Sequence, residues 1–407
     1  MYEQVAVERA VYGAGQNLLI CGSVQRLPRE VREWKERVQF VYLDPPFMTG
    51  EKFTRKRPYG EAGWRKGSPS LTVKGYEDRF ADEKAYLRFL RRMIAVSREL
   101  LKEEGVFCLH LDWRMSAQGR ILCDRIFGKD RFLNEIIWAY ESGGRSKRCF
   151  SRKHDTVLMF AKGEKYHFDL TRVPLARSAY RRNHMARSMD ESGRMYSSIY
   201  ANGKEYRYYD DDPVYPGDVW TDIGFLQQKD PERTGYPTQK PEKLLERLMK
   251  PVVREGDLVA DLCCGSGTTL AAAEKLGCGY LGLDVSPAAI PVCQGRLRAE
   301  NLTVVCGTAA EEAPVLASYD AEAGRLRMGG LALSGEPYPE KADPEALTEA
   351  WETGRIEGKV FYSEKRYQRS FQYPALIDSL QVDPGRIPDL LVTDAAGVRR
   401  AYRWRAE

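Results

Sequence analysis

The chain has 407 residues, of which 43% are hydrophobic and 30% are charged, a composition typical of a globular protein in water. At this length we expect two or three domains with at least one large core. No apolar run approaches the ~20 residues of a membrane-spanning helix, and the N-terminal residues do not resemble a signal peptide, so we expect a cytoplasmic protein.

The net charge of +5 permits a polyanionic partner without requiring one. The nine cysteines are odd in number and irregularly spaced, which excludes the disulfide framework of a small secreted protein. Cys263 and Cys264 are adjacent, a spacing that suits neither a CxxC metal site nor an ordinary disulfide. We therefore expect reduced cysteines and no metal centre.

The first 162 residues contain the continuous apolar runs that are typical of parallel strands covered on both faces. Helices are expected around 27–37 and over 81–105, where apolar residues recur at helical spacing. Between strand and helix, residues 48–80 are rich in glycine, proline and basic residues, and their length indicates a functional or mobile loop. The expected strands are 17–24, 38–46, 106–112, 134–140 and 155–162.

The character of the chain changes at residue 163. From 163 to 235, long apolar runs disappear and arginines alternate with aromatic residues. Between 241 and 286, helix and strand patterns alternate, which is the signature of β-α-β units and predicts an α/β fold. In the last hundred residues we expect a short helix and a hairpin at 389–405, within a small separate domain.

The segment DLVADLCCGSGTTL, residues 257–270, has the features of a ligand-binding loop. A predicted strand ends at Asp261, two glycines let the backbone approach a ligand, and the next helix offers free N–H groups to anionic atoms. Asp284, at the end of the next strand, is placed to accept hydrogen bonds from a ribose diol. The loop lacks the lysine of a P-loop and has Leu270 where a dinucleotide fingerprint has its third glycine. S-adenosyl-L-methionine, a nucleoside with a compact charged tail, fits this loop, and a plain tight turn is the alternative.

A second motif, VYLDPPF at residues 41–47, ends a predicted strand in a carboxylate, two prolines and a ring. Prolines stop strands, so a simple strand end is one interpretation. The motif, YPTQKPE at 236–242 and DLCCGSGTT at 261–269 together resemble the permuted class of amino-methylating DNA methyltransferases, in which the catalytic motif precedes the cofactor loop.

The resemblance covers roughly residues 17–300. It implies an α/β, Rossmann-like S-adenosylmethionine-dependent methyltransferase fold with a mostly parallel sheet, an inserted target recognition region and a small C-terminal domain. The implied parts are a catalytic half at 1–162, the target recognition region at 163–235, a cofactor-binding half at 236–310 and an α+β domain of unknown role at 311–407.

The resemblance also implies a chemistry for the catalytic motif. The lone pair of a base amino group is delocalised into the ring, and acceptors for its two N–H groups draw the nitrogen toward tetrahedral geometry. The carboxylate of Asp44 and the carbonyl of Pro45 are these acceptors, held in place because Pro45 and Pro46 have fixed φ angles. Phe47 offers a stacking face to a base swung out of the duplex. The transfer needs no metal and no covalent enzyme intermediate.

The cofactor contacts follow from the same resemblance. The family usually has phenylalanine at the position of Cys263 and Gly-Asp at the position of Gly22 and Ser23, and we expect these departures to weaken cofactor binding. The residues expected to hold the methionyl side are Asp261, Gly265, Gly267 and Thr268, with Asp284 at the ribose and with Thr238 and Lys240 closing the pocket.

The expected function is site-specific methylation of adenine N6 in double-stranded DNA, because an aspartate at the head of the motif more often accompanies adenine in this family. N4 methylation of cytosine is the first alternative, and an inactive DNA-binding protein is the second. The arginines of 163–235 suit contacts to phosphates and guanine edges. No nuclease motif is recognisable, so restriction activity would reside on a separate subunit, and both a monomer and a homodimer remain open.

Overall fold

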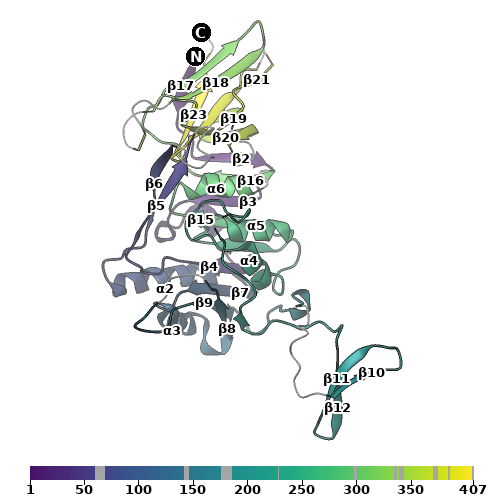
Figure 1. Ribbon diagram of the computed structural model, residues 1–407. Helices are drawn as coiled ribbons and strands as arrows, with labels where there is room; N and C mark the ends of the chain where they lie inside the picture. The colour runs from purple at the N-terminus through teal and green to yellow at the C-terminus, as the bar shows by residue number, and fades with distance from the viewer. Residues whose placement is uncertain are drawn as a thin grey trace.

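In the computed structural model, one sheet of fifteen strands runs through the length of the molecule, with the two termini together at one end (Figure 1). Three smaller sheets of two or three strands accompany it. The structure describes residues 1–59, 69–141, 146–175, 186–227, 229–297, 300–333, 337–338, 343–369, 375–383 and 386–405.

The centre of the large sheet consists of six neighbouring parallel strands. Their sequences are nearly continuous apolar runs, and every residue of the strand Val38–Leu43 is buried, as expected for strands covered on both faces. The predicted α/β fold with a parallel sheet is therefore confirmed in this region. In spatial order the strands are β16 (Asn301–Val305), β3 (Asn17–Cys21), β15 (Gly279–Asp284), β14 (Leu258–Asp261), β4 (Val38–Leu43) and β7 (Leu101–Leu111).

Helices cover both faces of the parallel strands. Because side chains alternate along a strand, Val41 and Leu43 pack with α2 and α3, whereas Phe40 and Tyr42 pack with α4, α5 and α6. The predicted helix over 81–105 ends earlier than expected, because Leu101 already belongs to β7. The helices are α2 (Glu83–Leu100), α3 (Ser116–Phe127), α4 (Glu242–Met249), α5 (Thr268–Lys275) and α6 (Ala289–Arg296).

Short helical turns complete the helical part of the described chain. The helix expected around 27–37 is reduced to one turn. These turns are η1 (Val24–Arg26), α1 (Arg29–Arg32), η3 (Lys129–Arg131) and η4 (Leu170–Arg172). Nowhere in the described ranges does a helix have the length and apolarity needed to cross a membrane.

Beyond β7 the sheet continues with β9 (His154–Ala161), which is antiparallel to β7, and then with β8 (Phe132–Ala139), which is antiparallel to β9. The last strand at this edge, β13 (Val219–Trp220), is parallel to β8. At the opposite edge, the N-terminal and C-terminal strands extend it further. Tyr2 pairs with Trp404, and β2 joins the C-terminal strands to β16. These strands are β2 (Arg9–Gly13), β20 (Val360–Gln368), β19 (Thr348–Glu357), β22 (Asp389–Asp394), β23 (Arg399–Trp404) and β1 (Tyr2–Val5).

The short helix expected near the C-terminus is wrong for the residues the structure describes beyond α6, which form strands instead. The reason is tertiary pairing, because β19 is hydrogen-bonded on both sides, to β20 and to β22. The hairpin expected at 389–405 is confirmed as β22 and β23. A second sheet of β17 (Val315–Asp320), β18 (Arg325–Leu331) and β21 (Ser379–Gln381) packs at the same end.

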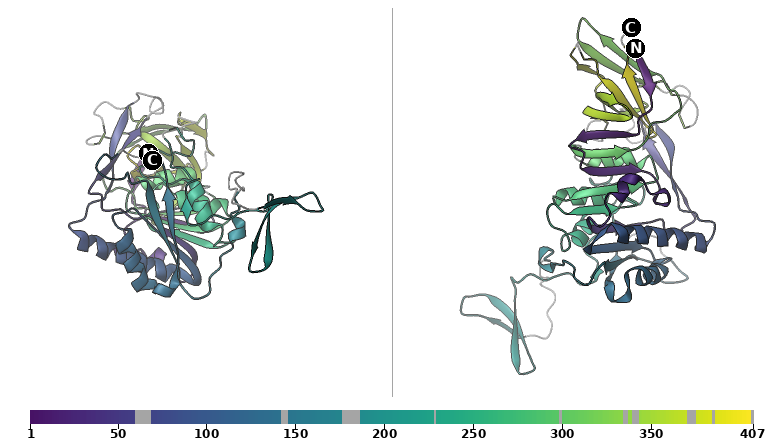
Figure 2. Two further views of the ribbon diagram at one scale, coloured as in Figure 1. Left: turned by 60° about the horizontal axis from the view of Figure 1, so that its bottom comes forward. Right: turned by 180° about the vertical axis from the view of Figure 1, so that it is seen from behind.

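Two further sheets stand apart from the central one. In the segment expected to be a long loop, β5 (Lys52–Pro58) and β6 (Ser70–Glu77) form an antiparallel hairpin. In the arginine- and tyrosine-rich segment, β10 (Ala186–Met189), β11 (Met195–Ala201) and β12 (Lys204–Tyr209) form a sheet that projects away from the body of the molecule (Figures 1 and 2). Neither sheet was foreseen, because the sequences of these strands lack the continuous apolar runs that reveal the strands of the central sheet.

Candidate active site

The two sequence motifs meet because their strands are neighbours. β4 and β14 pair in parallel, with Asp261 opposite Tyr42, so both strands end at the same edge of the sheet. β15 lies next to β14 and brings Asp284 to that edge as well. Carboxylates far apart in the chain are thereby gathered at one place, where ligands of open α/β sheets bind.

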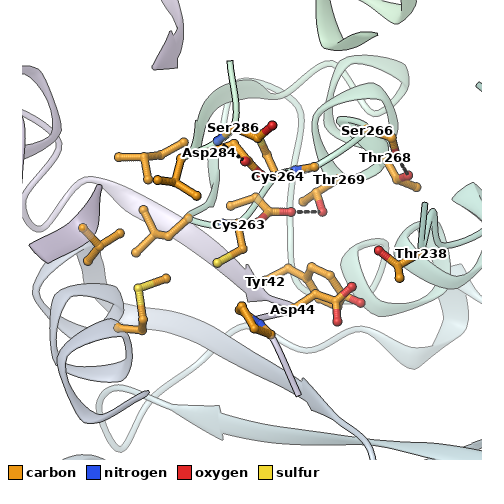
Figure 3. Close-up of a pocket in the computed structure, with 18 of the residues that line it drawn as sticks. Tyr42, Asp44, Thr238, Cys263, Cys264, Ser266, Thr268, Thr269, Asp284 and Ser286 are labelled. Carbon is orange, nitrogen blue, oxygen red and sulfur yellow. Dashed lines mark hydrogen bonds between the residues drawn. The ribbon is translucent and has the colours of Figure 1, made fainter. Parts of the chain in front are cut away.

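A cavity of about 490 Å³ opens at this edge. Its size is within the range of small-molecule sites. Asp44 and Thr238 lie on one side and Asp284 with Ser286 on the other, with Cys263 between them (Figure 3). Pro45, Phe47 and Gly267 lie outside its walls. The expected site residues that line it are Asp44, Pro46, Thr238, Lys240, Asp261, Gly265, Thr268 and Asp284.

The catalytic loop is held by a carboxylate that the sequence analysis missed. Asp78 is 1% exposed and accepts hydrogen bonds from the backbone N–H groups of Phe47, Met48 and Thr49, at 3.1, 2.8 and 3.0 Å. The hydroxyl of Tyr86 donates to the carbonyl of Pro46 at 2.9 Å. These contacts fix the chain on the far side of the two prolines, including Met48 at a φ of 59°.

Lys240 connects the catalytic motif to the cofactor loop. Its ammonium donates to Oδ2 of Asp44 at 2.5 Å and lies 5.3 Å from the centre of the Phe47 ring. Its backbone carbonyl accepts from the hydroxyl of Thr268 at 3.2 Å. Thr238, two residues earlier, has a φ of 60°, so the segment makes a strained turn where it enters the cavity. Lys240 thus lines the cavity and also contacts Asp44, and its role in closing the cofactor pocket stays a prediction.

Asp261 organises the cofactor loop from below. It is 2% exposed, and its carboxylate accepts from the backbone N–H of Cys263 at 3.0 Å and from the hydroxyl of Thr269 at 2.5 Å. Burial raises the pKa of Asp261 to about 7, and the two hydrogen bonds only partly offset this. The loop that it supports has positive φ angles at Gly265 and Gly267, of 50° and 76°. At Gly267 a Cβ would lie 2.9 Å from the Cys293 sulfur, so the turn requires glycine there.

Asp284 has one backbone donor on each oxygen. The N–H of Gly265 donates to Oδ2 and the N–H of Ser286 to Oδ1, both at 2.8 Å. Burial raises the pKa of this carboxyl, and the two donors partly counter the rise. A carboxylate has about four acceptor positions, so two remain for hydroxyl groups of a ligand.

A buried polar chain runs behind the catalytic motif, and the sequence analysis had assigned it no role. The hydroxyl of Tyr42 bonds with Nδ1 of His110 at 2.7 Å, and Nε2 of His110 bonds with Asp155 at 3.1 Å. Asp155 also accepts from Tyr140 at 2.9 Å. The His110 ring lies parallel to Phe47, with 6.1 Å between ring centres. These hydrogen bonds thus fix the position of the His110 ring, against which Phe47 stacks.

Two departures from the family pattern lie in the cavity wall. Cys263 and Ser23 both line it, and the hydroxyl of Ser23 accepts from the backbone of Gln25 at 3.2 Å, so it caps η1. Among the residues that the structure describes, no cluster of His, Cys, Asp and Glu has the geometry of a metal site.

Comparison with known proteins identifies the family of this architecture. A family model described as DNA methylase, for N6 and N4 methyltransferases, matches residues 38–294. Type II methyltransferase M.EcaI of Enterobacter cloacae is 26% identical in an alignment of 297 residues that covers 62% of each chain. Type II methyltransferase M2.DpnII of Streptococcus pneumoniae is 26% identical over 309 residues, 74% of this chain and 97% of its own length. The solved PvuII DNA methyltransferase, specific for cytosine N4, superimposes with a TM-score of 0.43 at 16% identity, over 71% of this chain and 89% of that one.

The support given by Asp78 leads to a first prediction. The substitution Asp78→Ala removes the acceptor of three partly buried N–H groups and should lower the free energy of unfolding by about 2–3 kcal/mol, measured by urea denaturation. Amide hydrogen exchange at Phe47, Met48 and Thr49 should become faster. The matched control is Asp320→Ala, which removes an exposed carboxylate that also accepts two backbone N–H groups and should cost less than about 1 kcal/mol. Equal losses in the two variants would contradict the role given to Asp78.

The pKa of Asp261 gives a second prediction. An unfolded Asp ionises near 3.8, whereas folded Asp261 ionises near 7. Its contribution to stability is therefore fully present below pH 4, falls as the pH rises to 7, and is constant above that. Unfolding of the wild type and of Asp261→Asn should be compared between pH 4 and pH 8. Their difference in unfolding free energy should change by roughly 4 kcal/mol over this interval, to the relative disadvantage of the wild type at high pH. A difference independent of pH would contradict the raised pKa.

Proposed function

Since the chain belongs to the DNA methylase family of N6 and N4 methyltransferases, we propose that it transfers a methyl group from S-adenosyl-L-methionine to the N6 amino group of adenine in double-stranded DNA. The observation that carries the proposal is the single cavity shared by Asp44 and the cofactor loop. A carboxylate suited to an amino group and a loop suited to a nucleoside face the same space, as a direct transfer between two bound molecules requires.

The cofactor is held by the walls on the β14 and β15 side. Asp261, Gly265, Gly267 and Thr268 form the turn that receives the methionyl part. The ribose hydroxyls donate to the acceptor positions that remain on Asp284. When bound, the cofactor supplies an electrophilic methyl group on a sulfonium centre. Gly267 acts through the backbone conformation of the turn, because it does not line the cavity itself.

The catalytic motif orients the amino group. Asp44 and the carbonyl of Pro45 each accept one N–H, which directs the nitrogen lone pair toward the methyl group. The bond from Tyr86 to the Pro46 carbonyl holds the peptide that separates these acceptors from Phe47. Once the nitrogen has taken the methyl group that the cofactor would supply, the surplus amino proton would pass to Asp44 or to solvent.

Lys240 holds the carboxylate of Asp44 in position before the substrate binds. Its ammonium holds Oδ2 of Asp44, which leaves Oδ1 and the second lone pair of Oδ2 for the amino group. This pairing sets the position of the carboxylate before the base arrives. Phe47, with His110 behind it, provides the face on which the extruded base stacks.

The target sequence is read by residues 163–235. The β10–β12 sheet projects from the body (Figure 2). Its exposed aromatic residues stand beside basic ones in the sequence. Tyr200 is 74% exposed, and Lys204 lies 5.8 Å from the Tyr206 ring. Such a surface suits a groove edge and its phosphates.

Adenine is preferred to cytosine because of the aspartate that begins the motif, and N4 methylation of cytosine is the second candidate. Relatives in restriction–modification systems, including the Mod subunit of the type III enzyme EcoPI from Escherichia phage P1, suggest a separate restriction partner. That relative is 29% identical over 160 residues, which are 37% of this chain and 25% of the subunit.

The proposal is tested by expressing the chain in a host without DNA methylation and sequencing its DNA with detection of modified bases. N6-methyladenine in one short sequence context is the expected result, and it also defines the target site. N4-methylcytosine instead of N6-methyladenine would show that the second candidate, methylation of cytosine, is the correct one. DNA without any modification, from cells that contain folded protein, would contradict the enzyme function.

A third prediction concerns Asp44. The substitution Asp44→Ala removes the acceptor that orients the amino group and should lower the rate of methyl transfer by about 10³-fold or more. Cofactor affinity, measured by calorimetry, should stay within about threefold of the wild type, because Asp261 and Asp284 are untouched. The matched control is Glu8→Ala, which removes an exposed carboxylate paired with Lys359 and should leave transfer unchanged. Retained activity in Asp44→Ala would overturn the role of this residue.

A further inference from the structure

The connection between β8 and β9 emerges at the sheet edge that carries the catalytic motif. β9 is antiparallel to β7, with Thr156 opposite Leu111, so the start of β9 lies beside the end of β7. β7 in turn neighbours β4, which leads into Asp44 (Figure 1). With strands spaced about 4.8 Å apart, the base of this connection lies within roughly 10–15 Å of the catalytic strand end.

The described part of the connection, residues 146–153, presents one aromatic ring to solvent. Phe150 is 99% exposed, which is more than any other large hydrophobic residue among those described. Four of its neighbours in the segment are basic, and the segment contains no acidic residue. A ring as exposed as this contributes little to the packing of the described chain, and it lies among basic residues beside the active site. The basic residues are Lys147, Arg148, Arg152 and Lys153.

The turn that carries Phe150 is built by its own hydrogen bonds. The hydroxyl of Ser146 accepts from the backbone N–H groups of Arg148 and Cys149, both at 3.3 Å, and the N–H of Ser146 donates to Ser151 at 3.1 Å. The guanidinium of Arg152 lies 3.7 Å from the centre of the Trp113 ring. Because Trp113 follows the end of β7, this contact attaches the turn to the edge of the active site.

The base of the same segment is tied to the polar chain behind the catalytic motif. The N–H of Tyr140 donates to the carbonyl of Lys153 at 2.8 Å, and the hydroxyl of Tyr140 donates to Asp155 at 2.9 Å. Asp155 bonds with His110, which supports Phe47. The exposed ring and the stacking face of the active site therefore share one rigid support.

We propose that Phe150 is a positioning residue that enters the base stack of DNA where the target nucleotide has been swung out, while the adjacent Lys147 and Arg148 bind the flanking phosphates. Apolar side chains, phenylalanine among them, wedge between base steps in this way. The wedge fills the gap left by the extruded base and so favours the extruded state. The inference rests on the proposed methylation of a flipped base.

The test compares Phe150→Ala with the wild type on a duplex that contains the target site found by sequencing. Without the ring, the extruded state is less populated, so kcat/KM should fall at least tenfold and the fluorescence of 2-aminopurine at the target position should rise less on binding. The distinguishing measurement uses a duplex with an abasic position opposite the target, where extrusion is already easy. On this duplex, Phe150→Ala should recover to within about threefold of the wild type, and Phe150→Trp should be active on both duplexes.

The control for the loss of an exposed apolar side chain is Ile121→Ala on α3, at a residue 52% exposed, which should behave as the wild type on both duplexes. Unchanged activity of Phe150→Ala on the matched duplex would overturn the proposal, and so would a loss that the abasic duplex does not restore. Wild-type protein that methylates no DNA would instead contradict the proposed function, so the two failures are distinguishable.

Discussion

The site depends on one structural constraint, the parallel pairing of β4 with β14. The register that sets Asp261 beside Tyr42 is formed by main-chain hydrogen bonds between segments more than 200 residues apart. Because both strands are buried on two faces, a slip by one residue would move every side chain to the opposite helix layer and disrupt the packing on both faces. The loops that follow the two strands are therefore held against each other. The order of the motifs along the chain has no influence on this arrangement, since the sheet fixes their positions in space.

Electrostatic contacts also hold the segment 236–242 against the catalytic motif and the cofactor loop. Arg296 of α6 is 9% exposed, donates to the hydroxyl of Thr268 at 3.0 Å and pairs with Glu242 at the start of α4. The pKa of Glu242 is lowered, because the hydrogen bonds from Lys275 and Arg296 outweigh its burial. Removing one partner of such a buried ion pair strongly destabilises a protein, because the other charge is left buried without a partner. Its position explains how Lys240, two residues before Glu242, reaches Asp44 from a fixed backbone.

The sequence predicted the buried strands, which appear as continuous apolar runs, and the carboxylates that end them. The strands that lead to Asp44, Asp261 and Asp284 were predicted because each is apolar up to its final carboxylate. Asp78 was missed because it stands in a polar segment, four residues before the helix cap Asp82, and its partners are backbone groups without a sequence pattern. His110 lies in an apolar strand and is fully buried, as a core residue would be, and only the fold places it behind Phe47. β19 has a polar sequence, TEAWETGRIE, and only its pairing partners make it a strand.

The C-terminal strands also bear on the cofactor loop, through a buried polar cluster around Tyr12. Its hydroxyl donates to Glu352 of β19 at 3.0 Å and accepts from Gln294 of α6 at 2.8 Å. The neighbouring Cys293 donates from its sulfur to the carbonyl of Gly265 at 3.3 Å and lies where Gly267 leaves no room for a side chain. A displacement of β19 would therefore be transmitted through Tyr12 and α6 to the turn at Gly265. The C-terminal region is in this sense part of the support of the cofactor loop.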